Sequence, residues 1–304
     1  MKNINYYGII LAIVAASLYA INSPLSKIML DYMPKTLMAG TLYLGAGLGM
    51  TIIFVFRKIV KNEKLEERLS KNELPYTIMM ILLDIAAPIF LLYGLNMTTS
   101  STVSLLNNFE IVVTALIAFA IFKEKISVRL WIGIIFITLS CMSLSLENIS
   151  SFKFSFGAIF VIIACVCWGI ENNCTRKISS KDPLQIVFIK GLFSGLGSII
   201  IGLIIGERFN SLWSVFVVLG IGLFAYGLSI FFYVHAQRII GAARTSAYYA
   251  IAPFVGTALS LIILKEKPLF QYFIALFLML IGAWLCSSDK KIFKKSKRKG
   301  AVKK

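Results

Sequence analysis

The sequence predicts an all-α membrane protein with ten transmembrane helices arranged as two inverted five-helix repeats. Hydrophobic residues make up 58% of its 304 residues, and its mean hydropathy is +0.84. A soluble protein of this length could not bury so much apolar surface. The second observation is a repeated tripeptide: Lys-Glu-Lys occurs at residues 123–125 and again at 265–267, each time between two long apolar runs.

Each long apolar run is expected to cross the membrane once, because about 20 apolar residues span a bilayer as a helix. In chain order the ten runs cover approximately residues 6–30, 34–56, 75–96, 99–122, 128–147, 154–178, 184–206, 212–236, 243–264 and 269–288. Most connections are only a few residues long, so no soluble domain is expected. The first run follows Lys2 as a signal peptide would, but it is the repeat partner of run 154–178 and is expected to be retained.

Recurring features indicate that one unit is present twice. The two Lys-Glu-Lys turns lie 142 positions apart, while Pro34 and Pro183 lie 149 positions apart. The polar stretch 57–73 of the first copy accounts for the difference between these offsets. The expected domains are a first repeat at residues 1–147, a second at 148–289 and a basic tail at 290–304. Five spans per repeat is an odd number, so the second repeat should enter the membrane from the opposite side.

The positions of Lys and Arg predict the orientation, because positively charged loops stay in the cytoplasm. If the N-terminus is inside, 24 of these residues lie in inner segments and six in outer ones, while Lys190 lies within a span. Both termini are therefore predicted to be cytoplasmic. The net charge of +17 then reflects topology and contact with anionic lipids rather than nucleic-acid binding. The charges of the Lys-Glu-Lys turns are expected to act as interfacial anchors.

Two of the predicted helices present matching polar faces. These faces consist of Tyr19, Asn22 and Ser26 and, at the equivalent positions of the second repeat, Trp168, Glu171 and Thr175. Within each set the residues are three and four positions apart, so they share one side of a helix. In hydrocarbon such a face is expected to point toward a partner helix or a water-filled cavity.

Charged residues inside spans form the second group of candidates. Asp84 lies one helical turn before Pro88; it could bind a cation or proton, or it could repair backbone hydrogen bonding disturbed by the proline. Glu110 follows Asn107 by three positions, so both can face a cavity, with helix packing as the alternative. Glu171 could contact substrate or pair with a lysine of the next helix.

Lys190 separates two substrate chemistries. If it is free, the site suits a zwitterion such as an amino acid, since Glu and Lys would bind its two charges. If it pairs with Glu171, then Asp84 and Glu110 leave a net negative pocket suited to a cation. Aromatic rings could contact such a cation through cation–π interactions; the candidates are Tyr19, Trp168, Tyr226, Tyr248 and Tyr249. The complete set of predicted substrate-binding residues is Tyr19, Asn22, Asp84, Asn107, Glu110, Trp168, Glu171, Lys190, Tyr226 and Tyr249.

Other residue types argue against enzyme and cofactor chemistry. His235 is the single histidine, so no second imidazole is present for a metal site or an acid/base pair. The five cysteines fall inside predicted spans without metal-ligand spacing, and no phosphate-binding loop occurs. No metal and no cofactor are therefore expected. Glycines at 40, 45, 47, 49, 191, 195 and 197 should allow close helix contacts, and their faces could also serve a homodimer.

Taken in order, these motifs resemble the drug/metabolite transporter superfamily, EamA-like branch. The resemblance covers nearly the whole chain and rests on Tyr19-Ala20 and Trp168-Gly169, on Pro34 and Pro183, and on the Lys-Glu-Lys turns before spans that contain Gly133 and Gly282. It implies a ten-helix carrier whose central cavity is lined mainly by the first, third and fourth helices of each repeat. Two departures are Thr41, where the second copy has Lys190, and Ile111, where the second copy has Pro253; the latter predicts fourth helices that bend differently.

The sequence thus predicts a secondary transporter that moves a small polar metabolite by alternating access, first of all an amino acid or related compound in the direction of efflux. The alternatives are an importer of an organic cation such as choline or a polyamine, and a membrane enzyme acting on lipid-linked substrates. Expected partners are the substrate, protons or another coupling ion, and membrane lipids. Topology, resemblance and the lack of a targeting peptide predict the bacterial cytoplasmic membrane.

Overall fold

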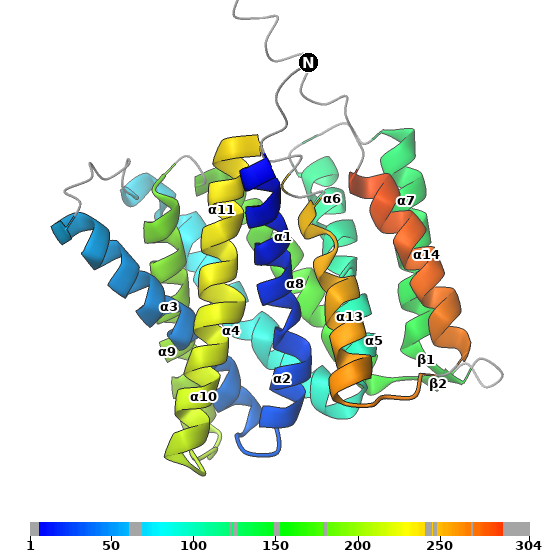
Figure 1. Cartoon of the computed structure of the whole chain (residues 1–304), viewed down its shortest axis with the longest axis horizontal. Coiled ribbons are helices and arrows are strands. Elements are labelled where there is room, and N and C mark those ends of the chain that lie inside the picture. The colour runs from blue at the N-terminus through cyan, green and yellow to red at the C-terminus, as the bar shows by residue number, and fades with distance from the viewer. Residues whose placement is uncertain are drawn as a thin grey trace, which may run out of the picture.

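The computed structural model describes residues 6–60, 69–121, 123, 127–148, 153–178, 181–240, 245, 248–268 and 270–287. Within these residues the chain is a bundle of helices that run between an upper and a lower face (Figure 1). The first half contains α1 (Tyr6–Ala20), α2 (Asn22–Met29), α3 (Lys35–Val60), a 3-10 turn (Lys71–Glu73), α4 (Leu74–Met97), α5 (Ser100–Leu106), α6 (Phe109–Ala120) and α7 (Val128–Ser145). A short antiparallel hairpin of β1 (Leu146–Asn148) and β2 (Lys153–Phe154) follows on the lower face.

The second half continues the bundle. It contains α8 (Phe156–Ile178), α9 (Pro183–Ile204), α10 (Leu212–Gly222), a π-helical segment η2 (Leu223–Leu228), α11 (Ser229–Ile240), α13 (Ala252–Ile263) and α14 (Phe270–Ser287). The predicted basic tail at 290–304 lies outside the described residues, as do Glu124 and Lys125 of the first Lys-Glu-Lys turn.

Eight segments of the described chain are long and apolar enough to cross a membrane. They are Tyr6–Met29, Lys35–Phe56, Lys71–Met97, Ser100–Ala120, Val128–Ser145, Phe156–Ile178, Leu184–Ile204 and Leu212–Tyr233. The last two predicted spans correspond to the shorter apolar helices Ala252–Ile263 and Phe270–Cys286. The all-helical membrane fold is therefore confirmed in outline, while the count of ten spans stays a prediction.

Several predicted spans are not continuous helices. The first is interrupted at Ile21. The fourth is interrupted at Asn107 and Asn108, where backbone N–H groups donate to the carbonyl three residues earlier instead of four. The chain is also interrupted at Ala250 and Ile251, just before Pro253 at the start of α13. Both fourth spans are thus interrupted close to equivalent positions, and the different bending expected from Ile111 and Pro253 stays a prediction.

Helices from the two halves pack against each other throughout the bundle. The most extensive pairs are α3 with α9, α4 with α8, α7 with α14 and α1 with α11. Glycines make the first pair possible: a Cβ atom added to Gly191 would lie 2.5 Å from the Cα of Gly47, and one added to Gly195 would lie 2.9 Å from the carbonyl oxygen of Gly40. These four glycines form close contacts inside the chain, so they are not available for a homodimer face, and the homodimer itself stays a prediction.

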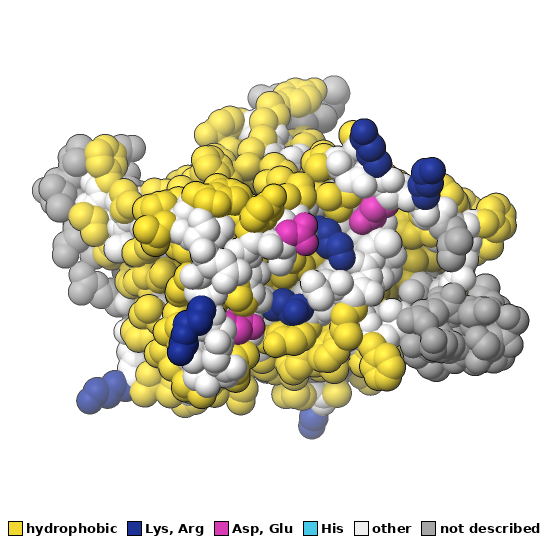
Figure 2. Space-filling view, turned by 90° about the horizontal axis from the view of Figure 1, so that it is seen from below, with side chains coloured by type: hydrophobic (Ala, Val, Ile, Leu, Met, Phe, Trp, Pro, Cys, Tyr) yellow, Lys and Arg dark blue, Asp and Glu magenta, His cyan; other side chains and the backbone are white. Residues whose placement is uncertain are grey.

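The outer surface of the bundle is apolar, as lipid-facing helices require. Large side chains such as Ile52, Phe216 and Phe277 are exposed on it. Figure 2 shows the lower face, where acidic side chains lie beside basic ones near the centre among abundant hydrophobic side chains.

Carboxylates from the second half cap helices of the first half. Glu207 accepts hydrogen bonds from the backbone N–H groups of Thr36 and Leu37 at the start of α3, at 3.3 and 2.8 Å. Glu266 accepts from Ser100 and Ser101 at the start of α5, at 2.7 and 3.0 Å. The unpaired N–H groups of a helix start favour such anionic partners. Glu266 of the second Lys-Glu-Lys turn is therefore a helix cap and not simply an interfacial anchor.

Candidate functional site

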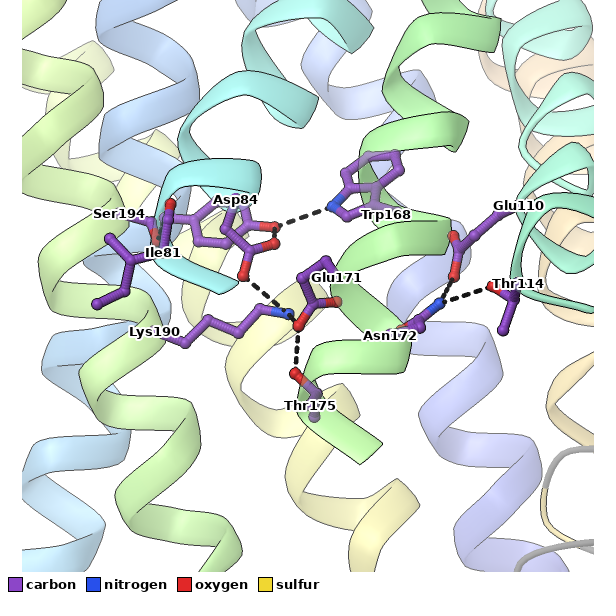
Figure 3. A network of polar contacts seen from close by, with 11 residues as sticks. Ile81, Asp84, Glu110, Thr114, Trp168, Glu171, Asn172, Thr175, Lys190 and Ser194 are labelled. Atoms are coloured by element: carbon purple, nitrogen blue, oxygen red, sulfur yellow. Dashed lines mark hydrogen bonds and ion pairs between the residues drawn. The ribbon is translucent and has the colours of Figure 1, made fainter. Parts of the chain in front are cut away.

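Three charged side chains from three helices meet inside the bundle (Figure 3). The Nζ atom of Lys190, on α9, lies 3.1 Å from Asp84 Oδ2 on α4 and 3.1 Å from Glu171 Oε1 on α8. The side chains of Asp84 and Glu171 are 0% and 2% exposed, and that of Lys190 is 15% exposed. We call these residues the charged triad. The alternative with a free Lys190 is wrong for this structure, and its pairing extends to Asp84 as well as Glu171.

Hydrogen bonds fix each carboxylate of the charged triad. Asp84 Oδ1 accepts from the hydroxyl of Tyr43 on α3, at 3.0 Å. The Tyr43 oxygen in turn accepts from Trp168 Nε1, at 3.3 Å. On the other side, the hydroxyl of Thr175 donates to Glu171 Oε1. Asp84 thus interacts with two other helices, and none of its described contacts is a repair of the backbone next to Pro88.

An aromatic group adjoins the charged triad. The ring of Tyr43 lies 5.2 Å from that of Tyr226, which lies 5.9 Å from Tyr19, and Tyr19 lies 6.0 Å from Tyr249. The Asn22 side chain donates to the Tyr226 hydroxyl at 3.1 Å. Five predicted residues, Tyr19, Asn22, Trp168, Tyr226 and Tyr249, therefore gather around Tyr43 and its neighbours.

The matching polar faces predicted for the two repeats carry matching hydrogen bonds. Ser26 Oγ donates to Asn22 Oδ1 at 3.1 Å in α2, as Thr175 donates to Glu171 in α8. Each donor lies one turn after its acceptor, as the spacing predicted. The acceptor is a neutral amide in one copy and a carboxylate in the other.

Glu110 belongs to a separate polar cluster. Its Oε1 accepts a hydrogen bond from Asn172 Nδ2, and Asn172 also contacts the hydroxyl of Thr114 at 3.4 Å. In Figure 3 this cluster lies on the other side of α8 from Asp84 and Lys190. Asn107 lies at the break before α6, and its buried Oδ1 has no hydrogen-bond partner among the described residues. Asn107 and Glu110 are therefore close in sequence to each other but do not join the charged triad.

Sequence reasoning missed Tyr43, Thr114 and Asn172. Tyr43 is the only one of these that carries a visible signal, a hydroxyl-bearing ring in the glycine-rich second run. Asn172 directly follows Glu171, but helical geometry points the two side chains in different directions.

The described contacts of His235 and Tyr248 are with residues other than those of the charged triad. His235 Nδ1 is 3.2 Å from the carbonyl oxygen of Phe231, and its ring packs on the Phe231 ring at 4.4 Å. Tyr248 packs against Leu11, Ala12 and Ala236. Among the described residues, no group of three or more His, Cys, Asp and Glu side chains could hold a metal ion.

Comparisons with known proteins agree with this architecture. The sequence model of the EamA-like transporter family matches residues 6–146 and 155–288. A protein of Methanothermobacter thermautotrophicus described as an uncharacterized transporter is 28% identical over 293 residues, which cover 92% of this chain and 85% of that protein. A crystal structure described only as that of a protein is similar over 95% of this chain and 98% of its own, with a TM-score of 0.66 and 15% identity. At this identity the likeness concerns the fold alone.

Proposed function

The chain belongs to the EamA-like transporter family, and on that premise we propose that it is a secondary transporter of a small polar metabolite that carries a positively charged amine. The membrane-spanning character of the chain follows from the family and from its apolar helices. The substrate part rests on one observation, which is the excess of acid inside the bundle. Asp84, Glu110 and Glu171 are inside it, and Lys190 is the basic residue that pairs with two of them.

The pairing of Lys190 favours an amine over a free carboxylate as the group that is recognised. An amino acid presents both, and its carboxylate would have to draw Lys190 away from two anions. An organic amine needs only the acids and the nearby rings of Tyr19, Trp168 and Tyr226. We therefore rank amines first and amino acids second, the reverse of the order in which the sequence alone placed them. No described contact favours the membrane enzyme.

We further propose that the ten apolar segments are two inverted repeats, residues 1–147 and 148–289, followed by the tail 290–304. The family match in two stretches supports this division. So do the left-handed backbones of Lys123 and Lys265, with φ of 53° and 51° at equivalent positions. Inverted repeats permit alternating access to a central site.

The direction and location of transport are proposed from the charge distribution and the family. The upper face of Figure 1, which carries the N-terminal end of α1, would be the cytoplasmic side of a bacterial membrane. Efflux driven by a coupling ion, with protons as the first candidate, is the mode we propose.

Uptake into proteoliposomes tests the function. The purified full-length chain is reconstituted, and the uptake of radiolabelled putrescine, choline, leucine and glutamate is measured with unlabelled substrate inside. Exchange of putrescine or choline supports the amine proposal. Exchange of leucine and glutamate without either amine would overturn it in favour of the amino-acid alternative.

A further inference from the structure

We propose that the charged triad is incomplete without one further cation, and that the ammonium group of the substrate supplies it by replacing Lys190 at Glu171. This inference rests on the proposed function and adds to it the position of the amine and the competitor that it must displace. In the ligand-bound state, Lys190 keeps Asp84 and the substrate takes Glu171.

The first step of the argument is the charge of the site. Two carboxylates share one ammonium group, and both carboxylates are almost completely buried. With all three groups ionised, the triad has one more negative charge than positive charge. An uncompensated charge is costly in a low-dielectric interior. One additional monovalent cation would balance the site, with two carboxylates against two cationic groups.

The second step is the difference between the two carboxylates. Asp84 is fully buried and accepts a hydrogen bond from the Tyr43 hydroxyl. The Tyr43 oxygen is itself fixed by a hydrogen bond from Trp168. Glu171 accepts its one described hydroxyl hydrogen bond from Thr175, which lies on the same helix. Thr175, which donates to Glu171, is partly exposed, as is Lys190. Glu171 is therefore the carboxylate beside the accessible part of the site, while Asp84 is the fixed partner.

The third step is the nature of Lys190. Its Nζ lies at the same distance, 3.1 Å, from each carboxylate, so the contact with Asp84 can persist when the contact with Glu171 is lost. A lysine ammonium is a compact charge on a flexible stem with three rotatable donors. It occupies the position that a primary amine would take, and so it acts as an internal competitor of the substrate.

Neighbouring groups favour a cation and disfavour an anion at this position. Glu110, held by Asn172 on the other side of α8, adds a further negative charge. The rings of Tyr43 and Trp168 adjoin the triad and can contact an alkylammonium group. A ligand carboxylate would instead meet three acids.

The test measures the binding of n-butylammonium to the purified full-length chain by isothermal titration calorimetry, with n-butanol as the uncharged isostere. Wild-type protein should bind the amine and not the alcohol. Lys190→Met removes the competitor and should bind n-butylammonium at least about tenfold more tightly, whereas Glu171→Gln should bind it at least about tenfold more weakly, since a close charge pair changes affinity by at least this factor. Glu73→Gln, the same substitution outside the site, should leave the affinity unchanged.

The outcomes separate this inference from the proposed function. If wild-type protein binds and transports amines but Lys190→Met binds them no more tightly, the displacement of Lys190 is wrong and the amine transporter stands. If wild-type protein neither binds nor transports any amine, the proposed function fails. If Lys190→Met does not fold, Asp84→Asn and Thr175→Val decide the matter: both should weaken amine binding, and unchanged affinity in both would overturn the inference.

Discussion

Two corresponding helical faces differ in charge: the face in the first half of this molecule is neutral, and the face in the second half is charged. In α2 the face is Asn22 with Ser26, and Asn22 donates to the Tyr226 hydroxyl. In α8 it is Glu171 with Thr175, and Glu171 pairs with Lys190. Local geometry is alike, because each hydroxyl donates to the acceptor one turn before it. The spacing of the residues therefore determines the hydrogen bond, while the identity of one residue, Asn22 or Glu171, determines whether the face can attract a cation.

Removing the charge from the α8 face should have the largest effect. Glu171→Gln makes this face resemble Asn22 of α2, so amine flux in proteoliposomes should fall at least about a hundredfold, as expected for the loss of a buried charge partner. Lys190 and Asp84 remain a neutral pair, so the variant should still fold, which circular dichroism checks. Flux of the folded variant within a factor of two of wild type would contradict the proposed role of Glu171.

The role of Asp84 as the fixed partner of Lys190 can be tested by removing the Tyr43 hydroxyl that donates to it. Tyr43→Phe removes the group that bridges Trp168 and Asp84, which leaves a buried carboxylate oxygen with one donor fewer. The melting temperature should fall, in line with a loss of about 1–3 kcal/mol, and amine affinity should fall about threefold to tenfold. Tyr226→Phe is the matched control, because its hydroxyl contacts Asn22 and not Asp84. Equal losses of affinity in both variants would show that Asp84 is not the fixed partner.

The neutral face should affect stability more than transport. Asn22→Leu removes the hydrogen bond to Tyr226 and leaves Ser26 without its described acceptor. The free energy of unfolding should fall by about 1–2 kcal/mol, measured by thermal denaturation in detergent. Amine affinity should change less than threefold. A loss of affinity as large as that of Glu171→Gln would mean that both faces bind the substrate.

Removing the equivalent hydroxyls of Ser26 and Thr175 should have the smallest effects, and it compares the two faces most directly. Thr175→Val should weaken amine binding about twofold to fivefold, because it removes a donor that holds Glu171. Ser26→Ala should leave amine affinity unchanged and should affect only the melting temperature. Isothermal titration calorimetry measures the amine affinity of both variants. Identical affinities would contradict the proposal that the α8 face binds the amine and the α2 face does not.

Much of the fold could be predicted because membrane helices follow from local composition. Apolar runs gave the helices, and the spacing of Asn22 and Ser26, or of Glu171 and Thr175, gave the correct local contacts. The breaks at Ile21 and at Asn107 were not predicted. Pro24, in the first turn of α2, is a local cause of the first break that was overlooked, because proline cannot donate to the carbonyl of Ala20, four residues before it. The break at Asn107 and Asn108 has no proline beside it, so it depends on side-chain bonding and packing against other helices.

The candidate site could be predicted only in part, for a related reason. Residues such as Asp84 and Lys190 stand out because charge in a span is costly, but the choice of partner depends on how α4, α8 and α9 are placed. Tyr43 was missed because its hydroxyl becomes important only when α3 lies beside Asp84. Asn172 was missed because its role depends on the position of Glu110 on another helix.

The carboxylate caps at the lower face have a kinetic consequence. Glu207 and Glu266 together hold four backbone N–H groups at the starts of α3 and α5. Any movement that separates the halves at this face must release all four, and no other helix end supplies acceptors of equal charge there among the described contacts. In the alternating-access cycle that we propose, Glu207 and Glu266 would therefore limit how fast this face opens. We expect a Glu→Gln change at either residue to alter the rate of turnover and not the choice of substrate.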